Sequence, residues 1–193
     1  VYAQPDKYKF LPIFYTKFSE KPNNPIFTIV IPGAVSQKRR DYERVLKSIK
    51  IFHFPLEIIF LGKAQGKELE MLQNFEQSKP ENISIKYFKE KVPQDVFDDY
   101  MQKADVLWCP IQQETEFFSQ KEIYGVTKMS GNIGDAIKFG KLAVFPENYP
   151  SKYSFIIPEK GSLGDFLFTK KDVDFSEFSK EKVLQELEKT IFA

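Results

Sequence analysis

The sequence predicts an α/β fold: an open, doubly wound, Rossmann-like sheet that is mainly parallel and carries helices on both faces. Short apolar runs alternate with helical segments along most of the chain, and this spacing is typical of βαβ units with right-handed crossovers. The apolar runs are continuous rather than alternating, as in strands buried on both faces. Glycine or proline ends several of these runs, which indicates a turn after each strand.

The strands are predicted from the apolar runs. The segment FTIVIPG, residues 27–33, is rich in β-branched side chains and ends in Pro-Gly, and LEIIFLG, residues 56–62, ends in glycine. Short continuous runs of this kind suit buried strands of a parallel sheet. The remaining strands are predicted at residues 82–88, 105–111 and 141–146, with a further short strand at 154–157.

Helical patterns fill the intervals between the strands. After the first strand, Tyr42, Val45 and Ile49 recur at helical spacing, and Ser36 is predicted as the N-cap. Pro93 stands at the start of another helix, a position that proline favours. The other helices are predicted around residues 67–78, up to Gly140, at 161–168 and at 179–193, and the Pro93 helix spans 93–104.

One domain is predicted after a short leading segment. Residues 1–25 contain several prolines and polar turns, and we expect them to form a linker or an edge segment. Residues 26–193 then form the Rossmann-like domain, a size that suits a single core. Because the sequence opens without methionine, we interpret it as a natural or engineered piece of a larger protein.

Composition excludes several kinds of protein. The net charge of +1 gives no overall attraction to nucleic acid. A single cysteine and a single histidine exclude an internal disulfide and a metal site built from those residues, so no metal is expected. No apolar run reaches the roughly 18 residues of a membrane span, and the start does not resemble a signal peptide. A cytoplasmic setting is therefore expected.

The first candidate site follows the first predicted strand. Ligands of such sheets bind outside the carboxyl ends of the strands, where these loops lie. The stretch GAVSQKRR, residues 33–40, places three cations beside the start of the next helix. Backbone N–H groups at a helix N-terminus attract anions. A phosphate site and a solvated basic helix face are both consistent with this pattern.

The second candidate site is EIYGVTKMSGNIGDAIKFGK, residues 122–141. It holds four of the nine glycines and two acids, Glu122 and Asp135. Glycine lets a backbone approach a ligand closely, and acids here suit hydrogen bonds from ribose or sugar hydroxyls. The alternative is tight packing of helix on sheet, with Gly140 as the C-terminal stop of the helix.

A long polar and aromatic loop, residues 110–122, leads into this stretch. Loops that follow a strand at the binding edge often carry function, and a flexible excursion is the alternative. Ser130 or Asn132 is predicted to cap the helix that follows the loop.

The order of elements over about residues 25–148 resembles the C-terminal, donor-binding half of the group 1-type glycosyltransferases, which have the GT-B fold. The segments YMQKADVLWCPI, EIYG and DAIKFGKLAV carry the resemblance. It implies that Gly33 together with Lys38 or Arg39 holds the donor diphosphate. It also implies that Glu122 contacts the donor sugar, so Lys38, Arg39 and Glu122 are the expected catalytic residues.

The spacing of the two acids departs from the family's pattern. The family places seven residues between its two acids, and here that position is Ser130 rather than an acid. The ribose contact is therefore expected from either Asp135 or Ser130. The resemblance further implies phosphate contacts from the amides of Val126 and Thr127, and a base held in the loop from Phe88 to Val92. The full set of expected donor-binding residues is Gly33, Ser36, Phe88, Val92, Gly125, Val126, Thr127, Ser130, Gly131 and Asp135.

The resemblance implies an enzyme that transfers a sugar from a nucleotide-diphosphate sugar to an acceptor, in cell-surface polysaccharide or glycolipid synthesis. Besides that donor it implies no cofactor. The acceptor, a glycan or a lipid-linked sugar, would bind an N-terminal half that this sequence lacks, so the isolated chain is expected to be inactive. Peripheral association of the full-length enzyme with the inner face of the membrane is expected as well. Two alternatives remain: a non-catalytic Rossmann-like nucleotide-binding or interaction domain, and a sugar-nucleotide epimerase of GT-B type.

Overall fold

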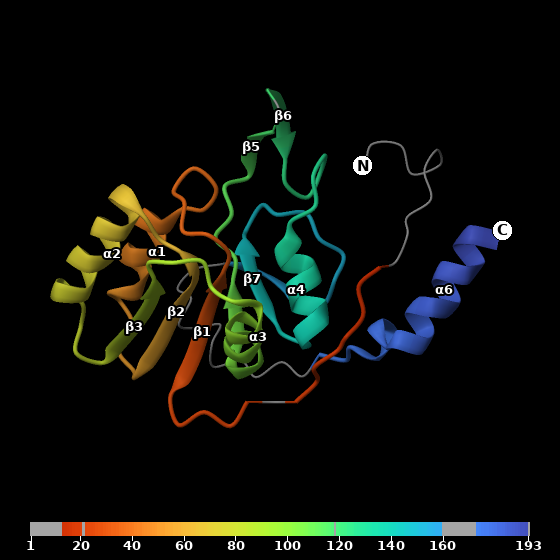
Figure 1. The fold of residues 1–193 in the computed structure, drawn as a ribbon, viewed down its shortest axis with the longest axis horizontal. Coiled ribbons are helices and arrows are strands. Elements are labelled where there is room, and N and C mark those ends of the chain that lie inside the picture. The colour runs from red at the N-terminus through yellow and green to blue at the C-terminus, as the bar shows by residue number, and fades with distance from the viewer. Residues whose placement is uncertain (1–12, 21, 118, 160–172, 193) are drawn as a thin grey trace.

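A six-stranded parallel sheet forms the centre of the protein (Figure 1). The structure, a computed structural model, describes residues 13–20, 22–117, 119–159 and 173–192. The strand order is β3-β2-β1-β4-β7-β8, and each of these neighbouring pairs is parallel. The direction of strand addition reverses between β1 and β4, which confirms the predicted doubly wound sheet. The strands are β1 (Phe27–Pro32), β2 (Leu56–Lys63), β3 (Ile83–Phe88), β4 (Val106–Trp108), β7 (Ala143–Pro146) and β8 (Ile156–Glu159).

Helices pack on both faces of this sheet. The two hydrophobic clusters take alternate residues of β1: Ile29 and Ile31 join the helices α1 and α2 on one face, and Val30 joins α3 and α4 on the other. Side chains of a strand alternate between faces, so a strand covered on both sides must be apolar throughout. The helices are α1 (Tyr42–Ile49), α2 (Gly66–Ser78), α3 (Gln94–Lys103), α4 (Gly131–Phe139) and α6 (Lys180–Phe192), with a 3-10 turn, η1 (Ser176–Phe178).

The predicted start of the first helix is wrong. α1 begins at Tyr42, and its N-cap is Asp41, whose carboxylate accepts from the backbone N of Arg44 at 3.1 Å. Ser36 instead closes a turn, because its carbonyl accepts from the N–H groups of the residues three and four positions later, both at 3.0 Å. The three cations therefore precede the helix rather than oppose its dipole in the first turn.

The loop predicted at 110–122 contains a hairpin. Strands β5 (Glu114–Phe117) and β6 (Gln120–Ile123) pair antiparallel and form a separate two-stranded sheet. Figure 1 shows this hairpin projecting beyond the edge at which β1 and β7 end. Regular cross-strand pairing holds this segment, so it is not an irregular excursion, and its role in binding stays a prediction.

The leading segment lies against α4. The ring of Phe18 stacks on Phe139 with centroids 5.2 Å apart, and the backbone N of Thr16 donates to the carbonyl of Phe178 at 2.8 Å. Residues 13–20 thus join the chain just before α6 and the end of α4, and the division at residue 25 stays a prediction. Residues 1–12 and the helix predicted at 161–168 lie outside the described residues.

Candidate functional site

The site begins where β1 ends, at the reversal point of the sheet. Gly33 has φ +102°, a left-handed conformation that favours glycine. A Cβ at Gly33 would lie 2.5 Å from Nη2 of Arg40, so the guanidinium rests directly over this peptide. The peptide in turn rests on β2, since a Cβ at Gly62 would lie 2.3 Å from the Gly33 carbonyl oxygen. Because Gly33 and Gly62 lack side chains, the Gly33 peptide can lie between β2 and the Arg40 guanidinium.

Arg40 has unused hydrogen-bonding capacity. Its Nη1 donates to the carbonyl of Ala34 at 3.3 Å, and its Nη2 donates to Oδ1 of Asn132 at 3.2 Å. Its Nε is buried and makes no hydrogen bond with the described residues. A guanidinium has five N–H donors, and a buried donor without a partner is costly. An anion at this position would satisfy it.

The N-terminus of α4 meets Arg40 through Asn132. Ser130 caps the helix, because its hydroxyl accepts from the backbone N of Asn132 at 3.3 Å, and both residues are buried. The Asn132 amide nitrogen donates to Oδ2 of Asp135 at 3.1 Å and to the carbonyl of Pro32 at 3.4 Å. One buried amide therefore connects the end of β1, the guanidinium and the first turns of α4.

Burial sets the charge of two groups beside this cluster. Burial raises the pKa of Asp135, while the hydrogen bond from Asn132 and the charges of Lys138 and Arg40 lower it. Burial also raises the pKa of the Cys109 thiol, so this cysteine at the end of β4 is neutral. A neutral buried thiol is not a nucleophile. Cys109 therefore offers no thiolate beside the Arg40 guanidinium.

Backbone hydrogen bonds hold the loops after β1 and β4 together. The N–H of Asp41 donates to the carbonyl of Pro110 at 2.8 Å, and the N–H of Gln112 donates to the carbonyl of Arg39 at 2.9 Å. Arg40 and Ile111 form an antiparallel bridge between these bonds. The backbone of Arg40 is thus fixed across the reversal point of the sheet.

The structure places Lys38 and Arg39 differently from Arg40. Both side chains are exposed, and Ser36 is half-buried in the turn that precedes them. Gly131 begins α4 in an open position, with nothing within 4 Å of a Cβ built on it. At the end of β3, Phe88 packs edge-on against Tyr100, with ring centroids 5.7 Å apart. Val92 also packs against the α3 and α4 cluster.

The EIYG segment lies in and after the hairpin. Glu122 belongs to β6 and accepts a hydrogen bond from the Thr127 hydroxyl. The amides of Val126 and Thr127 both donate to the carbonyl of Ile123, at 3.1 and 2.9 Å, so in this structure they close a turn. Gly125 has φ +84°, and a Cβ there would lie 2.8 Å from the ring of a proline that follows β7.

The structure thus brings together Gly33, Ser130 and Asp135, and it adds Arg40 and Asn132. No described contact joins Glu122 to Lys38 or to Asp135. The sequence contained a signal for Arg40, since it is the last cation before the buried Tyr42. For Asn132 it offered only a capping role, because the contacts of its amide with Pro32 and Arg40 depend on the close approach of β1 to α4.

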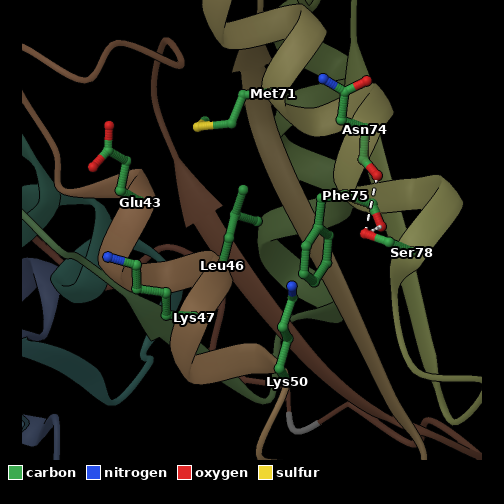
Figure 2. A pocket seen from close by; sticks show the side chains of 8 residues that line it. All are labelled: Glu43, Leu46, Lys47, Lys50, Met71, Asn74, Phe75 and Ser78. Carbon is green, nitrogen blue, oxygen red and sulfur yellow. Dashed lines mark hydrogen bonds between the residues drawn. The ribbon is translucent and has the colours of Figure 1, made fainter.

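A groove of about 310 Å³ lies elsewhere, between α1 and α2 (Figure 2). Figure 2 shows the ammonium group of Lys50 near the ring of Phe75, and the two lie 5.9 Å apart. The groove is formed along two helices rather than at the ends of strands, where ligands of such sheets bind. Its lining residues are Glu43, Leu46, Lys47, Lys50, Met71, Asn74, Phe75 and Ser78.

Metal-binding clusters and membrane-spanning helices are both absent from the part of the chain that the structure describes. No group of three or more His, Cys, Asp or Glu side chains in this part of the chain is arranged to hold a metal ion. Within the same residues, every helix is too short or too polar to cross a membrane.

The fold is shared with solved glycosyltransferase structures. The lipopolysaccharide outer core galactosyltransferase WaaB, in its apo form, matches with a TM-score of 0.55 and 11% identity, over 95% of this chain and 54% of that chain. The chain has the fold of one half of a GT-B glycosyltransferase. The C-terminal domain of a group 1 family glycosyl transferase, LpcC, from Francisella tularensis matches with a TM-score of 0.51 and 12% identity, over 94% of each chain.

The predicted resemblance to a GT-B half is therefore confirmed at the level of the fold. The chain spans about half the length of the WaaB chain and nearly all of the LpcC domain. No family model matches the chain, and no curated protein matches it.

Proposed function

We propose that this GT-B half binds the nucleotide-diphosphate sugar of a glycosyltransferase, and that Arg40 binds the diphosphate. The observation that supports this proposal is the guanidinium over Gly33, which has a buried Nε without a partner and lies beside the N-terminus of α4. Guanidinium groups bind phosphate through paired hydrogen bonds, and helix N-termini favour anions. Both features meet at the reversal point, where dinucleotides bind in doubly wound sheets.

The reaction proposed for the complete enzyme is transfer of the sugar to an acceptor. Negative charge builds up on the diphosphate as the bond to the sugar breaks, and a fixed cation stabilises that charge. Arg40 supplies this stabilisation, and the exposed Lys38 and Arg39 add attraction at longer range. No metal or further cofactor is required by this arrangement. Glu122 is proposed to contact the donor sugar once the hairpin closes on the ligand.

The remaining parts of the proposal concern the whole protein. The acceptor, a glycan or lipid-linked sugar of cell-surface polysaccharide or glycolipid synthesis, would bind a second half. We propose that the full-length enzyme acts in the cytoplasm, with peripheral association at the inner face of the membrane. The two solved glycosyltransferases support a transferase role because they share the fold of this chain. A donor screen on a protein that carries both halves tests it, and absence of transfer from every donor would contradict it.

Calorimetry with UDP and GDP tests the binding function directly. We expect weak binding of at least one of them by the isolated chain. The Arg40→Ala substitution should weaken binding of the nucleoside diphosphate by about tenfold or more, as expected for loss of hydrogen bonds to a charged group. The nucleoside alone should bind equally well to both proteins. The double variant Lys38→Ala, Arg39→Ala should lose less affinity for the nucleoside diphosphate, and this loss should diminish with added salt.

Two outcomes of this experiment contradict the proposal. A folded sample that binds neither nucleotide at millimolar concentration would contradict donor binding. If Arg40→Ala lost as much affinity for the nucleoside as for the nucleoside diphosphate, this would contradict binding of the diphosphate by the guanidinium.

A non-catalytic binding domain is the second candidate function. It is favoured by the contacts of Glu122 and Thr127, which join each other rather than the Arg40 cluster. Such a domain would bind nucleotide as described but would tolerate Glu122→Gln in every assay. A transferase carrying both halves should lose transfer with that variant while nucleotide binding persists.

A further inference from the structure

Asp135 already has a hydrogen-bonding partner within the Arg40 cluster. The side chain belongs to the second turn of α4 and is half-buried. Its Oδ2 already accepts from the amide nitrogen of Asn132 at 3.1 Å. The charged groups that act on it, besides this amide, are Lys138, Arg40 and Asp98, and the neutral Cys109 thiol lies close by. The carboxylate is therefore held toward the interior of the cluster.

The amide of Asn132 has one orientation that satisfies all of its neighbours. On one side lie two acceptors, the Asp135 carboxylate and the carbonyl of Pro32. On the other side lies Arg40, which can only donate. The NH₂ group must face the acceptors, and the amide oxygen must face the guanidinium. A reversed amide would set its NH₂ group against the Arg40 donors and leave the carboxylate facing a carbonyl oxygen.

We propose that Asp135 is a positioning residue, which acts through Asn132 to hold the Arg40 guanidinium over Gly33 with its free donors directed to the diphosphate. This inference rests on the proposed function and deepens it. It assigns no ribose contact to Asp135. The side chains of Asp135, Asn132 and Arg40 form one chain of contacts, called the relay below, in which each orients the next. Buried side chains whose partners fix their orientation are a general means of preorganising a charged group.

The relay has consequences for the ligand that differ from those of a ribose contact. A variant that releases Asn132 should weaken binding of every compound with a diphosphate, including inorganic pyrophosphate, which has no ribose. It should leave a nucleoside unaffected. If Asp135 contacted the ribose directly, the pattern would be the opposite. Its removal would weaken binding of the nucleoside and leave binding of pyrophosphate unaffected.

The experiment compares Asp135→Ala with Asp98→Ala in the chain as it exists. Asp135→Ala removes the oxygen that accepts from Asn132, which Asp135→Asn would not do, because an amide oxygen also accepts. Asp98 is a suitable control because it is also a half-buried carboxylate, and it pairs with Lys138 at 2.9 Å instead of Asn132. Calorimetry would follow pyrophosphate, uridine and guanosine, and UDP and GDP. We expect Asp135→Ala to weaken binding of pyrophosphate and of the nucleoside diphosphates by about tenfold. Binding of both nucleosides to Asp135→Ala, and of every ligand to Asp98→Ala, should change by less than about twofold.

A second readout does not depend on any ligand. The Nε–H of Arg40 is a single resonance that NMR can assign by its loss in Arg40→Lys. In the wild-type chain it should be sharp and protected from exchange, because the guanidinium is fixed and its Nε is buried. In Asp135→Ala, and equally in Asn132→Ala, it should shift and exchange faster, while Asp135→Glu should restore part of the wild-type behaviour.

The outcomes separate the two proposals. An Arg40 resonance unchanged by Asp135→Ala overturns the positioning role of Asp135, whatever the ligands do, and so does a loss of nucleoside binding with unchanged binding of pyrophosphate. A resonance that moves as expected, in a wild-type chain that binds no nucleotide and no pyrophosphate, upholds the positioning of Arg40 and overturns the proposed function. Melting curves of each variant exclude a loss of the fold as the cause.

Discussion

Lys141 provides a prediction that pH can test. This lysine precedes β7, is only 4% exposed, and donates from Nζ to the carbonyl of Gln102 at 2.7 Å. Burial lowers the pKa of Lys141 from 10.5 to about 8, and the carboxylate of Asp105 offsets only part of this effect. The folded protein thus holds a charge that water would solvate better.

The sign of the effect follows from proton binding. Below pH 8 the ammonium is protonated in both the folded and the unfolded state, so the full cost of burying the charge weakens the fold. Between pH 8 and 10.5 the folded protein releases its proton first, and the unfolded state binds more protons, so the free energy of unfolding rises. For a pKa displaced from 10.5 to about 8, the gain between pH 7 and 9.5 is about 2 kcal/mol.

The Lys141→Met variant removes this titration while keeping an unbranched side chain of similar length. Urea unfolding at intervals from pH 7 to 9.5 should show the wild-type chain gaining about 2 kcal/mol relative to the variant. Lys189→Met is the matched control, because the Lys189 side chain is 70% exposed and its removal should leave the pH slope unchanged. The range stops at pH 9.5 because tyrosines titrate above it. Parallel curves for wild type and Lys141→Met would refute the reasoning.

Three further predictions concern the backbone around the site, and each is checked by urea unfolding. Gly62→Ala should cost roughly 2 kcal/mol or more, because its Cβ would lie 2.3 Å from the Gly33 carbonyl, whereas the matched Gly131→Ala should be neutral or stabilising in its open position. Asp41→Ala should cost about 1 kcal/mol through loss of the α1 cap, and an unchanged midpoint would contradict that cap. Gly140→Ala should cost about 1 kcal/mol, because this residue ends α4 at φ +57°, and a stabilised variant would show that conformation to be absent.

The sheet could be predicted from the sequence because its physical cause is local. A strand covered on both faces must be apolar at every position, and FTIVIP and LEIIFLG show this without any knowledge of their neighbours. Their alternation with helical patterns then restricts the topology to a few arrangements. The doubly wound parallel sheet followed from those two facts, whereas the likeness to a GT-B half came from the segments YMQKADVLWCPI, EIYG and DAIKFGKLAV.

The start of α1 and the hairpin were harder, for different reasons. Ser36 and Asp41 are both good capping residues. Asp41 is the one that caps α1, whose first residue is the buried Tyr42. Residues 114–116 of β5 and 120–123 of β6 include no buried side chain, so the pairing of these strands has no apolar pattern to reveal it. In both cases tertiary contacts decided between local alternatives.

The site was predicted in outline only. Gly33 and Asp135 were named from the sequence, and the cation expected at the diphosphate was Lys38 or Arg39, whereas the cation that contacts the Gly33 turn and Asn132 in the structure is Arg40. The difference arises because neighbouring cations in a turn are equivalent in sequence and point in different directions in space. Asn132 was considered only as a helix cap, since its partners lie far away in the chain, on β1 and in the loop that follows it.

The bonds between the loops after β1 and β4 have a consequence for motion. The amides of Asp41 and Gln112 can exchange with solvent only when the same short ladder opens. Arg40 is part of that ladder and the β5–β6 hairpin follows it in the chain, so a hinge movement of the hairpin must either preserve the ladder or release both amides together. Correlated deuterium uptake at these two positions would therefore report, without any ligand, whether the hairpin and the guanidinium move as one unit.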